Sequence, residues 1–389
     1  MDINRMRQET PGCLNKIFLN SAGGSLMPDS VVETMTRYLE QEKELGAYET
    51  AARNTQHINR FYEETAKLLN CNPSNIAFVT SSTDAYSKAL SSIPFQKDDC
   101  IITTDDDYIS NQLAFLSLQK REGVKVIRMK NLPDHELDLE DLDQLIKTHK
   151  PKLIAVTQIP TNSGLIQNVE GVGKICKQYD ILYLVDACQS VGQLPVDAKA
   201  IGCDFLTATG RKFIRGPRGT GLLYVSDKVL QQDLVPLFLD TKGATWVQFD
   251  DYEIGTTAKR FEHWETSMVN LLGLTEAIRY ANSVGLDYIE KYNKNLSSQL
   301  RKGLQDKGLK VLDEGNHLGS IVTFCEKDGK IENAKKVLEE NNVFFSLSNK
   351  QNALINFTHK NVDSAIRLSP HYFNTHEEME QVVRLLSSL

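Results

Sequence analysis

Residues 181–225 have the sequence ILYLVDACQSVGQLPVDAKAIGCDFLTATGRKFIRGPRGTGLLYV. The apolar run 181–185 has the length and composition of a strand buried on both faces, and it ends at the carboxylate Asp186. A second apolar run and a polar turn lead to Lys212, and a glycine-rich bend leads to a third predicted strand, 221–225. The interval between Asp186 and Lys212 leaves room for one helix and the next strand. Open α/β sheets bind their ligands at the carboxyl ends of the strands. An acid and a lysine at two neighbouring ends of this kind therefore indicate a ligand site.

The chemistry that suits this pair is that of pyridoxal phosphate (PLP). Its aldehyde condenses with a lysine amine as a Schiff base, and its ring nitrogen needs a carboxylate partner. Asp186 would keep that nitrogen protonated, so that the ring can accept electrons from the α-carbon of a substrate. Taken singly, each residue has an ordinary alternative, a helix cap for Asp186 and a solvated surface position for Lys212. Their combination with the glycine-rich exit favours the cofactor.

The motifs VDACQSVGQLPVD and TATGRKFIRGPRGTGLLYV resemble those of the class V, fold-type I family of PLP enzymes. That family includes cysteine desulfurases, isopenicillin N epimerase-like proteins and the C–S lyases of ergothioneine biosynthesis. The resemblance extends from about Phe18 to the C-terminus. It implies an α/β fold with a mostly parallel sheet in a large domain and a smaller C-terminal α/β domain. The alternation of predicted strands and helices agrees with such a sheet.

Three segments are predicted along the chain. Residues 1–28 form an N-terminal arm, 29–284 the large PLP-binding domain, and 285–389 the small domain, which opens with a long helix over about 285–307. The predicted helix that begins the large domain has Asp29 or Ser30 as its N-cap.

The composition bounds the function classes. The net charge of −7 gives no electrostatic reason to expect nucleic acid or an anionic membrane surface. The seven cysteines lack C-x-x-C pairs and metal-ligand spacing, so we expect neither disulfides nor a metal site. The N-terminus lacks the apolar core of a signal peptide, and no apolar run is long enough to span a membrane. These features predict a cytoplasmic protein.

Small hydroxyl residues follow the predicted strand 76–80 and open a helix. A helix N-terminus presents free amides and a positive dipole end to an anion. Such residues are also ordinary caps, but the family places the phosphate of PLP here. The resemblance therefore implies phosphate contacts from the amide of Ser82, from Thr83 and from Thr209. The glycine found in the familiar version of this motif is absent.

Three further residues are expected at the PLP ring. By resemblance, Tyr108 stands where the family has an aromatic side chain, often histidine, stacked on the ring. Asn162 and Gln189 would donate to the phenolate oxygen, although Asn162 could also be a plain turn residue before a glycine. The acids at 105–107 would repel a phosphate, so we expect them to point away from it or into solvent.

Substrate contacts are predicted at three places. Arg367 lies in an alternating strand; alone it would be an outward-facing charge, but in the family it grips the substrate α-carboxylate, a task that suits its fork of donors. Ala22 belongs to the segment that lines the substrate side of the family's pocket. Arg211 stands where desulfurases commonly have histidine, and it could bind an acidic or sulfoxide group, the phosphate or a nearby acid.

The resemblance also implies a homodimer with active sites at the interface. In many relatives a Gly-Thr pair touches the phosphate of the other subunit, and here Trp264-Glu265 stand at those positions. A glutamate would repel that phosphate, so a contact would come from backbone, from Thr266 or not at all.

The reaction is predicted from the cysteines. Cysteine desulfurases need a mobile thiol shortly before the C-terminal arginine, and no cysteine lies between Val343 and Arg367. Cys325 is on a predicted core strand and Cys188 is expected to pack beside the cofactor. We therefore expect a C–S lyase, which removes sulfur by β-elimination from a cysteine conjugate or its sulfoxide and releases pyruvate and ammonia. An aminotransferase and an amino-acid epimerase are alternatives; a noncatalytic scaffold is disfavoured by the intact Lys212, Asp186 and Gln189.

Overall fold

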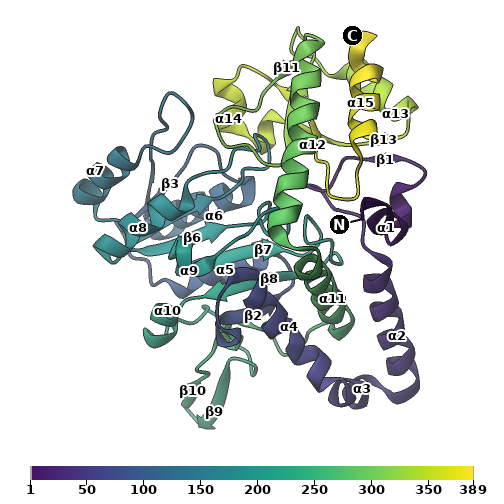
Figure 1. The fold of residues 1–389 in the computed structure, drawn as a ribbon. Coiled ribbons are helices and arrows are strands. Elements are labelled where there is room, and N and C mark those ends of the chain that lie inside the picture. Colours follow the sequence, from purple (N-terminus) through teal and green to yellow (C-terminus); the bar gives the residue numbers. More distant parts are fainter. Residues whose placement is uncertain (1, 389) are drawn as a thin grey trace.

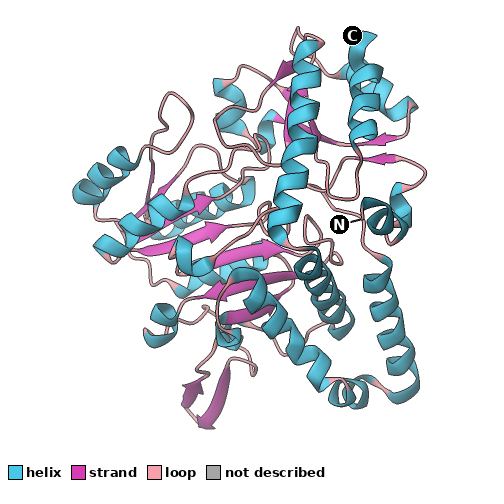
Figure 2. Ribbon diagram, viewed as in Figure 1, coloured by secondary structure: helices cyan, strands magenta, loops and turns pink. Residues whose placement is uncertain are grey.

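The computed structural model describes residues 2–388, and its centre is a seven-stranded sheet (Figures 1 and 2). Within this sheet β8 runs antiparallel to both of its neighbours, and the remaining strands share one direction. In spatial order the strands are β2 (Ile76–Val79), β8 (Gly221–Val225), β7 (Phe205–Thr209), β6 (Leu182–Asp186), β5 (Leu153–Thr157), β3 (Cys100–Thr103) and β4 (Lys125–Arg128). The predicted mostly parallel sheet is confirmed.

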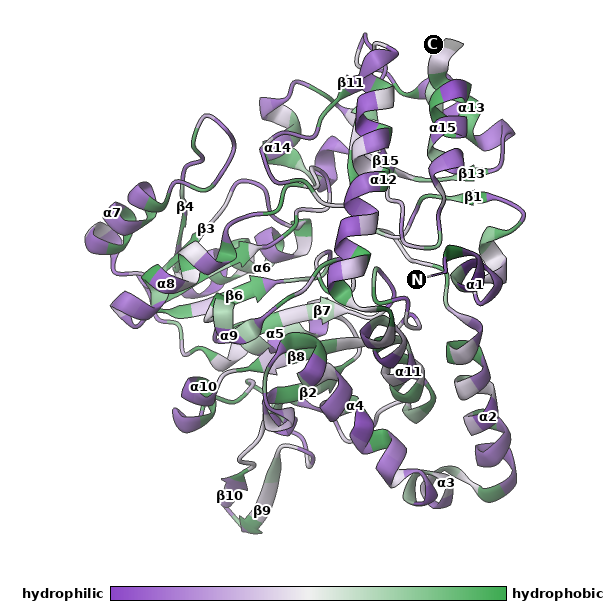
Figure 3. Ribbon diagram, viewed as in Figure 1, coloured by the Kyte–Doolittle hydropathy of each residue, from purple (hydrophilic) through white to green (hydrophobic). Residues whose placement is uncertain are grey.

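Both faces of this sheet are covered by helices, which explains why its strands are apolar at successive positions. A hydrophobic core lies on each face of the sheet, and alternate residues of a strand belong to different cores. Val185 belongs to the first core and Leu184 to the second. The first core is completed by α4 (Thr55–Leu69), α7 (Leu139–His149), α8 (Val169–Tyr179), α9 (Ala198–Ile201) and α11 (Met268–Val284). The second is completed by α5 (Ser82–Ser92), α6 (Ile109–Glu122) and α10 (Asp227–Gln231). Figure 3 shows the apolar strands enclosed by helices whose outer sides are hydrophilic.

The C-terminal part begins with the long helix α12 (Leu286–Asp306), close to its predicted bounds. It packs on an antiparallel sheet of β11 (Lys310–Val311), β12 (Val322–Cys325), β15 (Ser364–Leu368) and β14 (Ser346–Asn349). Helices α13 (Glu332–Glu340), α14 (Leu354–His359) and α15 (His376–Leu385) complete this part. Just before β14 the chain forms a separate short strand, β13 (Val343–Phe344), which pairs outside this sheet.

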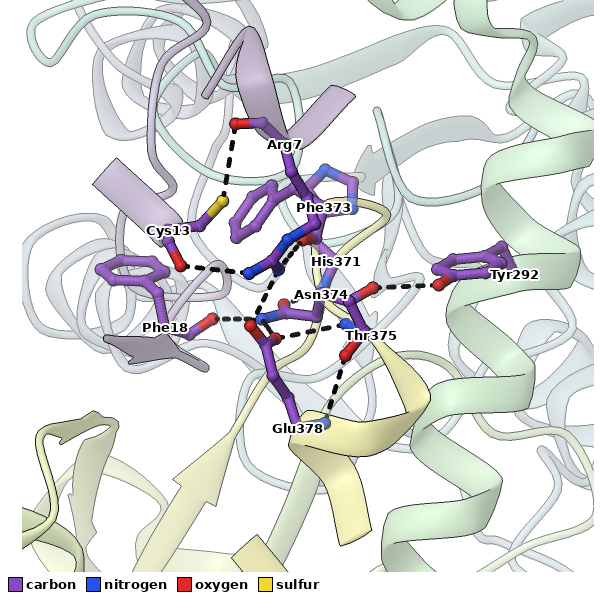
Figure 4. Close-up of polar contacts among 9 residues, drawn as sticks. All are labelled: Arg7, Cys13, Phe18, Tyr292, His371, Phe373, Asn374, Thr375 and Glu378. Carbon is purple, nitrogen blue, oxygen red and sulfur yellow. Dashed lines mark hydrogen bonds and ion pairs between the residues drawn. The ribbon is translucent and has the colours of Figure 1, made fainter. Parts of the chain in front are cut away.

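The N-terminal segment is bound to the C-terminal part. It contains α1 (Ile3–Gln8) and β1 (Ile17–Phe18), and β1 pairs in parallel with β13. Arg7 forms an ion pair of 2.8 Å with Glu378 and donates to the carbonyl of Phe373 at 2.7 Å (Figure 4). Helices α2 (Asp29–Leu45) and α3 (Ala47–Arg53) follow. The N-cap of α2 is Pro28, without a side-chain bond, so the predicted cap at Asp29 or Ser30 is wrong.

The tract after β8 contains strands that the sequence analysis did not predict. It contains a hairpin of β9 (Ala244–Gln248) and β10 (Asp251–Ile254), whose residues are almost all exposed. A strand exposed on both faces has no alternation of apolar and polar residues to reveal it. Among residues 2–388, no helix combines the length and hydropathy that a membrane span requires.

Candidate active site

Polar side chains gather where β6 and β7 end and where α5 begins. Asp186 is the last residue of β6, and Lys212 lies three positions after the end of β7. They share a cavity of about 280 Å³, close to the lower limit of the range typical of small-molecule sites. The cavity is lined by Thr80, Ser81, Ser82, Thr83, Tyr108, Asn111, Asp186, Cys188, Thr209, Arg211, Lys212, Arg218 and Gly219. Asn111 and Arg218 were not predicted from the sequence.

Asp186 is buried, and neutral donors orient its carboxylate. Oδ1 accepts the backbone N–H of Cys188 at 2.9 Å, and Oδ2 accepts Nδ2 of Asn111 at 2.9 Å. A buried carboxylate is costly unless a cation or further donors compensate it. A protonated ring nitrogen would supply both a charge and a donor.

Lys212 is also buried, and its Nζ lies 5.7 Å from the centre of the Tyr108 ring. Burial lowers the pKa of the Lys212 amine, and the charges of Arg211 and Arg367 lower it further, while Asp186 opposes them. The amine is therefore more readily neutral than an exposed lysine, as a nucleophile and proton acceptor requires.

The start of α5 is suited to an anion. Ser81 caps this 11-residue helix by accepting the backbone N–H of Asp84 at 3.1 Å, and Thr83 lies in its first turn. Arg211 and Arg218 line the same cavity. The carboxylate of Asp84 does not oppose them, because it accepts from Thr80 and lies 3.4 Å from Nζ of Lys88. Free amides and two guanidinium groups fit a phosphate.

Two of the residues predicted to bind this phosphate use their hydroxyl groups for bonds within the protein. The hydroxyl of Ser82, whose amide was the predicted contact, donates to that of Thr207 at 3.0 Å. Thr209 donates to the carbonyl of Thr220 at 3.2 Å. Both residues still line the cavity.

The acids at 105–107 do not all face solvent, but none of them is among the residues that line the cavity, which agrees with the expected orientation away from the phosphate. Asp106 is buried and accepts the hydroxyl of Ser163 at 2.5 Å. The carboxylate of Asp107 accepts five donors, from Thr103, Tyr108, Asn111, Gln112 and Thr157. Burial raises the pKa of Asp107 to about 6. These acids accept hydrogen bonds from polar groups at the ends of the strands. The positions of the acids in the sequence do not reveal these bonds.

A second cluster joins the N-terminal segment to β15. Nε2 of Gln189 donates to the carbonyl of Ala22 at 3.2 Å and to the hydroxyl of Thr161 at 2.6 Å. Arg367 donates through NH1 to the hydroxyl of Thr161 at 2.8 Å and through NH2 to that of Ser346 at 3.1 Å. Asn162 is buried, and its carbonyl accepts from Thr323. Thr161, which the sequence did not single out, therefore connects Gln189 and Arg367.

Arg367 is a buried cation whose hydrogen bonds all go to neutral oxygens. Burial, with a smaller effect of Arg211, lowers the pKa of its guanidinium to about 10. Its Nε and the Oε1 of Gln189 are buried, and neither atom has a hydrogen-bond partner among residues 2–388. A buried cation without a counterion favours an anionic ligand. The donor set of this site thus fits PLP together with a carboxylate substrate.

The family model for class V aminotransferases, described as "Aminotransferase class-V", matches residues 17–382. The chain belongs to the class V aminotransferase family. It is therefore a PLP-dependent enzyme, and the fold type, the family and the cofactor predicted from the sequence are confirmed.

Named relatives and solved structures agree with this assignment. A probable cysteine desulfurase of Methanothermobacter thermautotrophicus is 28% identical over 99% of this chain and 97% of its own length. The apo structure of a cysteine desulfurase from Thermococcus onnurineus superposes with a TM-score of 0.92 at 24% identity, covering 100% and 98% of the two chains. Two structures of a cystine C–S lyase, one with glycine linked to its PLP and one with its product cysteine persulfide, superpose with TM-scores of 0.86 and 0.85 at 20% identity, each covering 98% and 99% of the chains.

Proposed function

We propose that this class V enzyme is a C–S lyase that acts on S-substituted cysteines. The reaction takes up one water: R–S–CH2–CH(NH3+)–COO− and H2O give R–SH, pyruvate and NH4+. The α-proton and the C–S bond are lost, and the water oxygen becomes the keto oxygen of pyruvate. The substrate is thus an amino acid with sulfur on its β-carbon.

The proposal is carried by the positions of the thiols. Between Val343 and Arg367 the chain has no cysteine, and that segment forms β13, β14, α14 and β15. Cys325 lies fully buried in β12, and burial raises the pKa of its thiol. Cys188 lines the cavity, but burial raises the pKa of its thiol to about 12. A protonated thiol is a poor sulfur acceptor, so we expect the sulfur to leave as a free product.

Residues of this chain prepare the substrate. Bound PLP supplies an electron-withdrawing ring at the α-carbon. We assign to Arg367 the α-carboxylate, because its guanidinium forms no ion pair in the part of the chain that the structure describes, and to Asp186 the ring nitrogen. Fixing the carboxylate decides which bond of the α-carbon stands perpendicular to the ring, and so favours loss of the proton over loss of CO2. Lys212, whose amine has a lowered pKa, takes that proton.

The residues at the phosphate and at the phenolate oxygen complete the assignment. The amides of Ser82 and Thr83 with Arg211 and Arg218 would hold the phosphate, and Tyr108 would cover the ring. We assign the phenolate oxygen to Asn162 and Gln189, as predicted, with Gln189 giving up one of the two hydrogen bonds of its amide. To Thr161 we assign the substrate carboxylate beside Arg367. The support is that Thr161 contacts both Gln189 and Arg367.

Product analysis tests the reaction. The purified holoenzyme is incubated with cystine, with S-alkyl cysteines and their sulfoxides, and with cysteine, and pyruvate, alanine, keto acids and D-amino acids are measured. The lyase forms pyruvate and ammonia in equal amounts, and Lys212→Ala forms neither. Alanine with persulfide would establish a desulfurase instead. Keto acid formed only with an amino acceptor would identify an aminotransferase, and D-amino acid an epimerase.

We also propose a cytoplasmic homodimer. Large apolar side chains are exposed around the hairpin β9–β10, among them Phe238 at 81%, Trp246 at 76%, Phe249 at 94% and Trp264 at 58%. Exposed patches of this kind mark protein–protein contacts. Trp264, Glu265 and Thr266 would then face the partner. Sedimentation of the wild type and of Phe249→Ser with Trp246→Ser tests this; an unchanged monomer peak for the wild type contradicts it.

A further inference from the structure

A chain of hydrogen bonds leads from Asp186 away from the cavity. Nδ2 of Asn111 donates one hydrogen to Oδ2 of Asp186 at 2.9 Å and the other to Oδ1 of Asp107 at 3.0 Å. Only a nitrogen can donate to two carboxylates, so the orientation of this amide is fixed by its partners. Asn111 is 3% exposed, on the first turn of α6, and it was not singled out from the sequence.

Asp107 is itself firmly held. Its Oδ1 also accepts the backbone N–H of Tyr108 and the hydroxyl of Thr157, and Oδ2 accepts from Thr103 and Gln112 at 3.2 Å each. Thr157 is the register partner of Asp186 on the neighbouring strand. The ends of β3, β5 and β6 are therefore joined by a single polar network.

We propose that Asn111 and Asp107 are positioning residues for Asp186, which fix its carboxylate toward the ring nitrogen of PLP. Two effects act together. The amide of Asn111 stops the Asp186 carboxylate from turning, which keeps one oxygen aimed at the ring. Asp107 holds that amide in place and adds a second negative charge behind the first, and this strengthens the attraction to a protonated ring nitrogen.

This inference rests on the proposed role of Asp186 and holds whichever reaction follows. It makes a specific demand: the contribution of Asn111 must depend on the ring nitrogen. A cofactor analogue in which CH replaces that nitrogen keeps the phosphate and the aldehyde, but it has nothing to offer Asp186. Comparison of the two cofactors separates positioning from general damage to the fold.

The experiment measures the affinity of the apo protein for PLP and for the CH analogue. Asn111→Leu is expected to weaken PLP binding about tenfold, the value of one hydrogen bond to a charged group, and to leave binding of the analogue within about twofold. Gln112→Leu is the matched control, because Gln112 contacts Asp107 but not Asp186; its affinities should both stay within about twofold of the wild type. Asn111→Ser, too short to bridge the carboxylates, serves if the leucine variant does not fold.

The outcomes are distinguishable. Equal weakening of both cofactors by Asn111→Leu would show a merely structural role and overturn the proposal, as would no weakening of either. Asp186→Ala should also bind PLP and the analogue alike. If Asp186→Ala still binds PLP more tightly than the analogue, the proposed role of Asp186 fails, and the positioning network fails with it. If Asp186→Ala loses this preference but the Asn111 variants keep it in full, only the network is refuted.

Discussion

The hydroxyl oxygen of Thr161 lies 2.8 Å from NH1 of Arg367 and 2.6 Å from Nε2 of Gln189. It accepts from both. The amide of Gln189 cannot be reversed without loss of its bond to the carbonyl of Ala22, which only a nitrogen can donate. The hydrogen of the Thr161 hydroxyl is thus left for a ligand oxygen, beside the guanidinium that we assign to the substrate carboxylate.

Thr161→Val should therefore weaken the binding of carboxylate substrates. Loss of one hydrogen bond to a charged group, with the weaker hold on Arg367, is expected to raise KM about tenfold, with a smaller change in kcat. Thr161→Ser, which keeps the hydroxyl, should stay near the wild type. The affinity for a decarboxylated substrate analogue, measured by cofactor absorbance, should not change; an equal loss for this analogue would contradict the assignment.

Lys212→Ala should abolish the Schiff-base absorbance of the holoenzyme near the visible edge of the spectrum and eliminate turnover. PLP itself should still bind, because the phosphate and ring contacts are untouched. Lys199→Ala is the control, because it removes an exposed lysine of α9, on the connection between β6 and β7, and it should keep the spectrum. An unchanged spectrum in Lys212→Ala would remove this lysine from its role.

The stability of the apo protein should depend on pH through Asp107. Burial raises the pKa of its carboxyl from 3.8 to about 6 in the folded chain, so between these values the folded state binds more protons than the unfolded state. Its contribution to the free energy of unfolding therefore increases as pH falls through 6. The free energy of unfolding in urea is measured for the wild type and for Asp107→Asn. The value for the wild type minus that for the variant should be about 1 kcal/mol more positive at pH 5 than at pH 7.5. A difference that does not vary with pH would refute this.

The network that binds the N-terminal segment to α15 should contribute to stability (Figure 4). The side chains of Arg7 and Glu378 are only 17% and 11% exposed, and Glu378 also closes the capping box of α15 with Thr375. Arg7→Ala leaves Glu378 without its cation and should lower the free energy of unfolding by about 2 kcal/mol. Arg5→Ala, at the exposed pair with Glu9, should have little effect. Equal effects of the two variants in urea unfolding would show that burial of the pair is unimportant.

Most strands of the central sheet could be predicted because both of their faces are buried, so their composition is apolar over the whole strand. Asp186 and Lys212 stand out for the same reason, because Asp186 ends such a strand and Lys212 comes shortly after one. The edge strand β4, which begins with Lys125 and ends with Arg128, is partly exposed and was not predicted. The hairpin β9–β10 lacks this signal, and α14 is a single short helix within a polar segment.

Side-chain direction was harder to predict. Thr161 and Asn162 are neighbours in one loop, and both residue types bind ligands. Only the fold shows that the Thr161 hydroxyl contacts Arg367, and that the backbone carbonyl of Asn162 accepts from Thr323. The direction of the Asp107 side chain was equally hidden, because four of its five donors come from β3, β5 and α6 and only Tyr108 is its neighbour in the sequence. Contacts between distant segments leave no local pattern in a single sequence.

The pairing of β1 with β13, and the bridge from Asn20 to Ser369, have a consequence for biosynthesis. A ribosome makes Ala22 before Asp186, and Asp186 before Arg367. A nascent polypeptide that stops before residue 343 has neither Arg367 nor β13, so β1 has no strand to pair with. Premature termination anywhere before Arg367 should thus yield a product without a finished substrate pocket, however well its central sheet has formed.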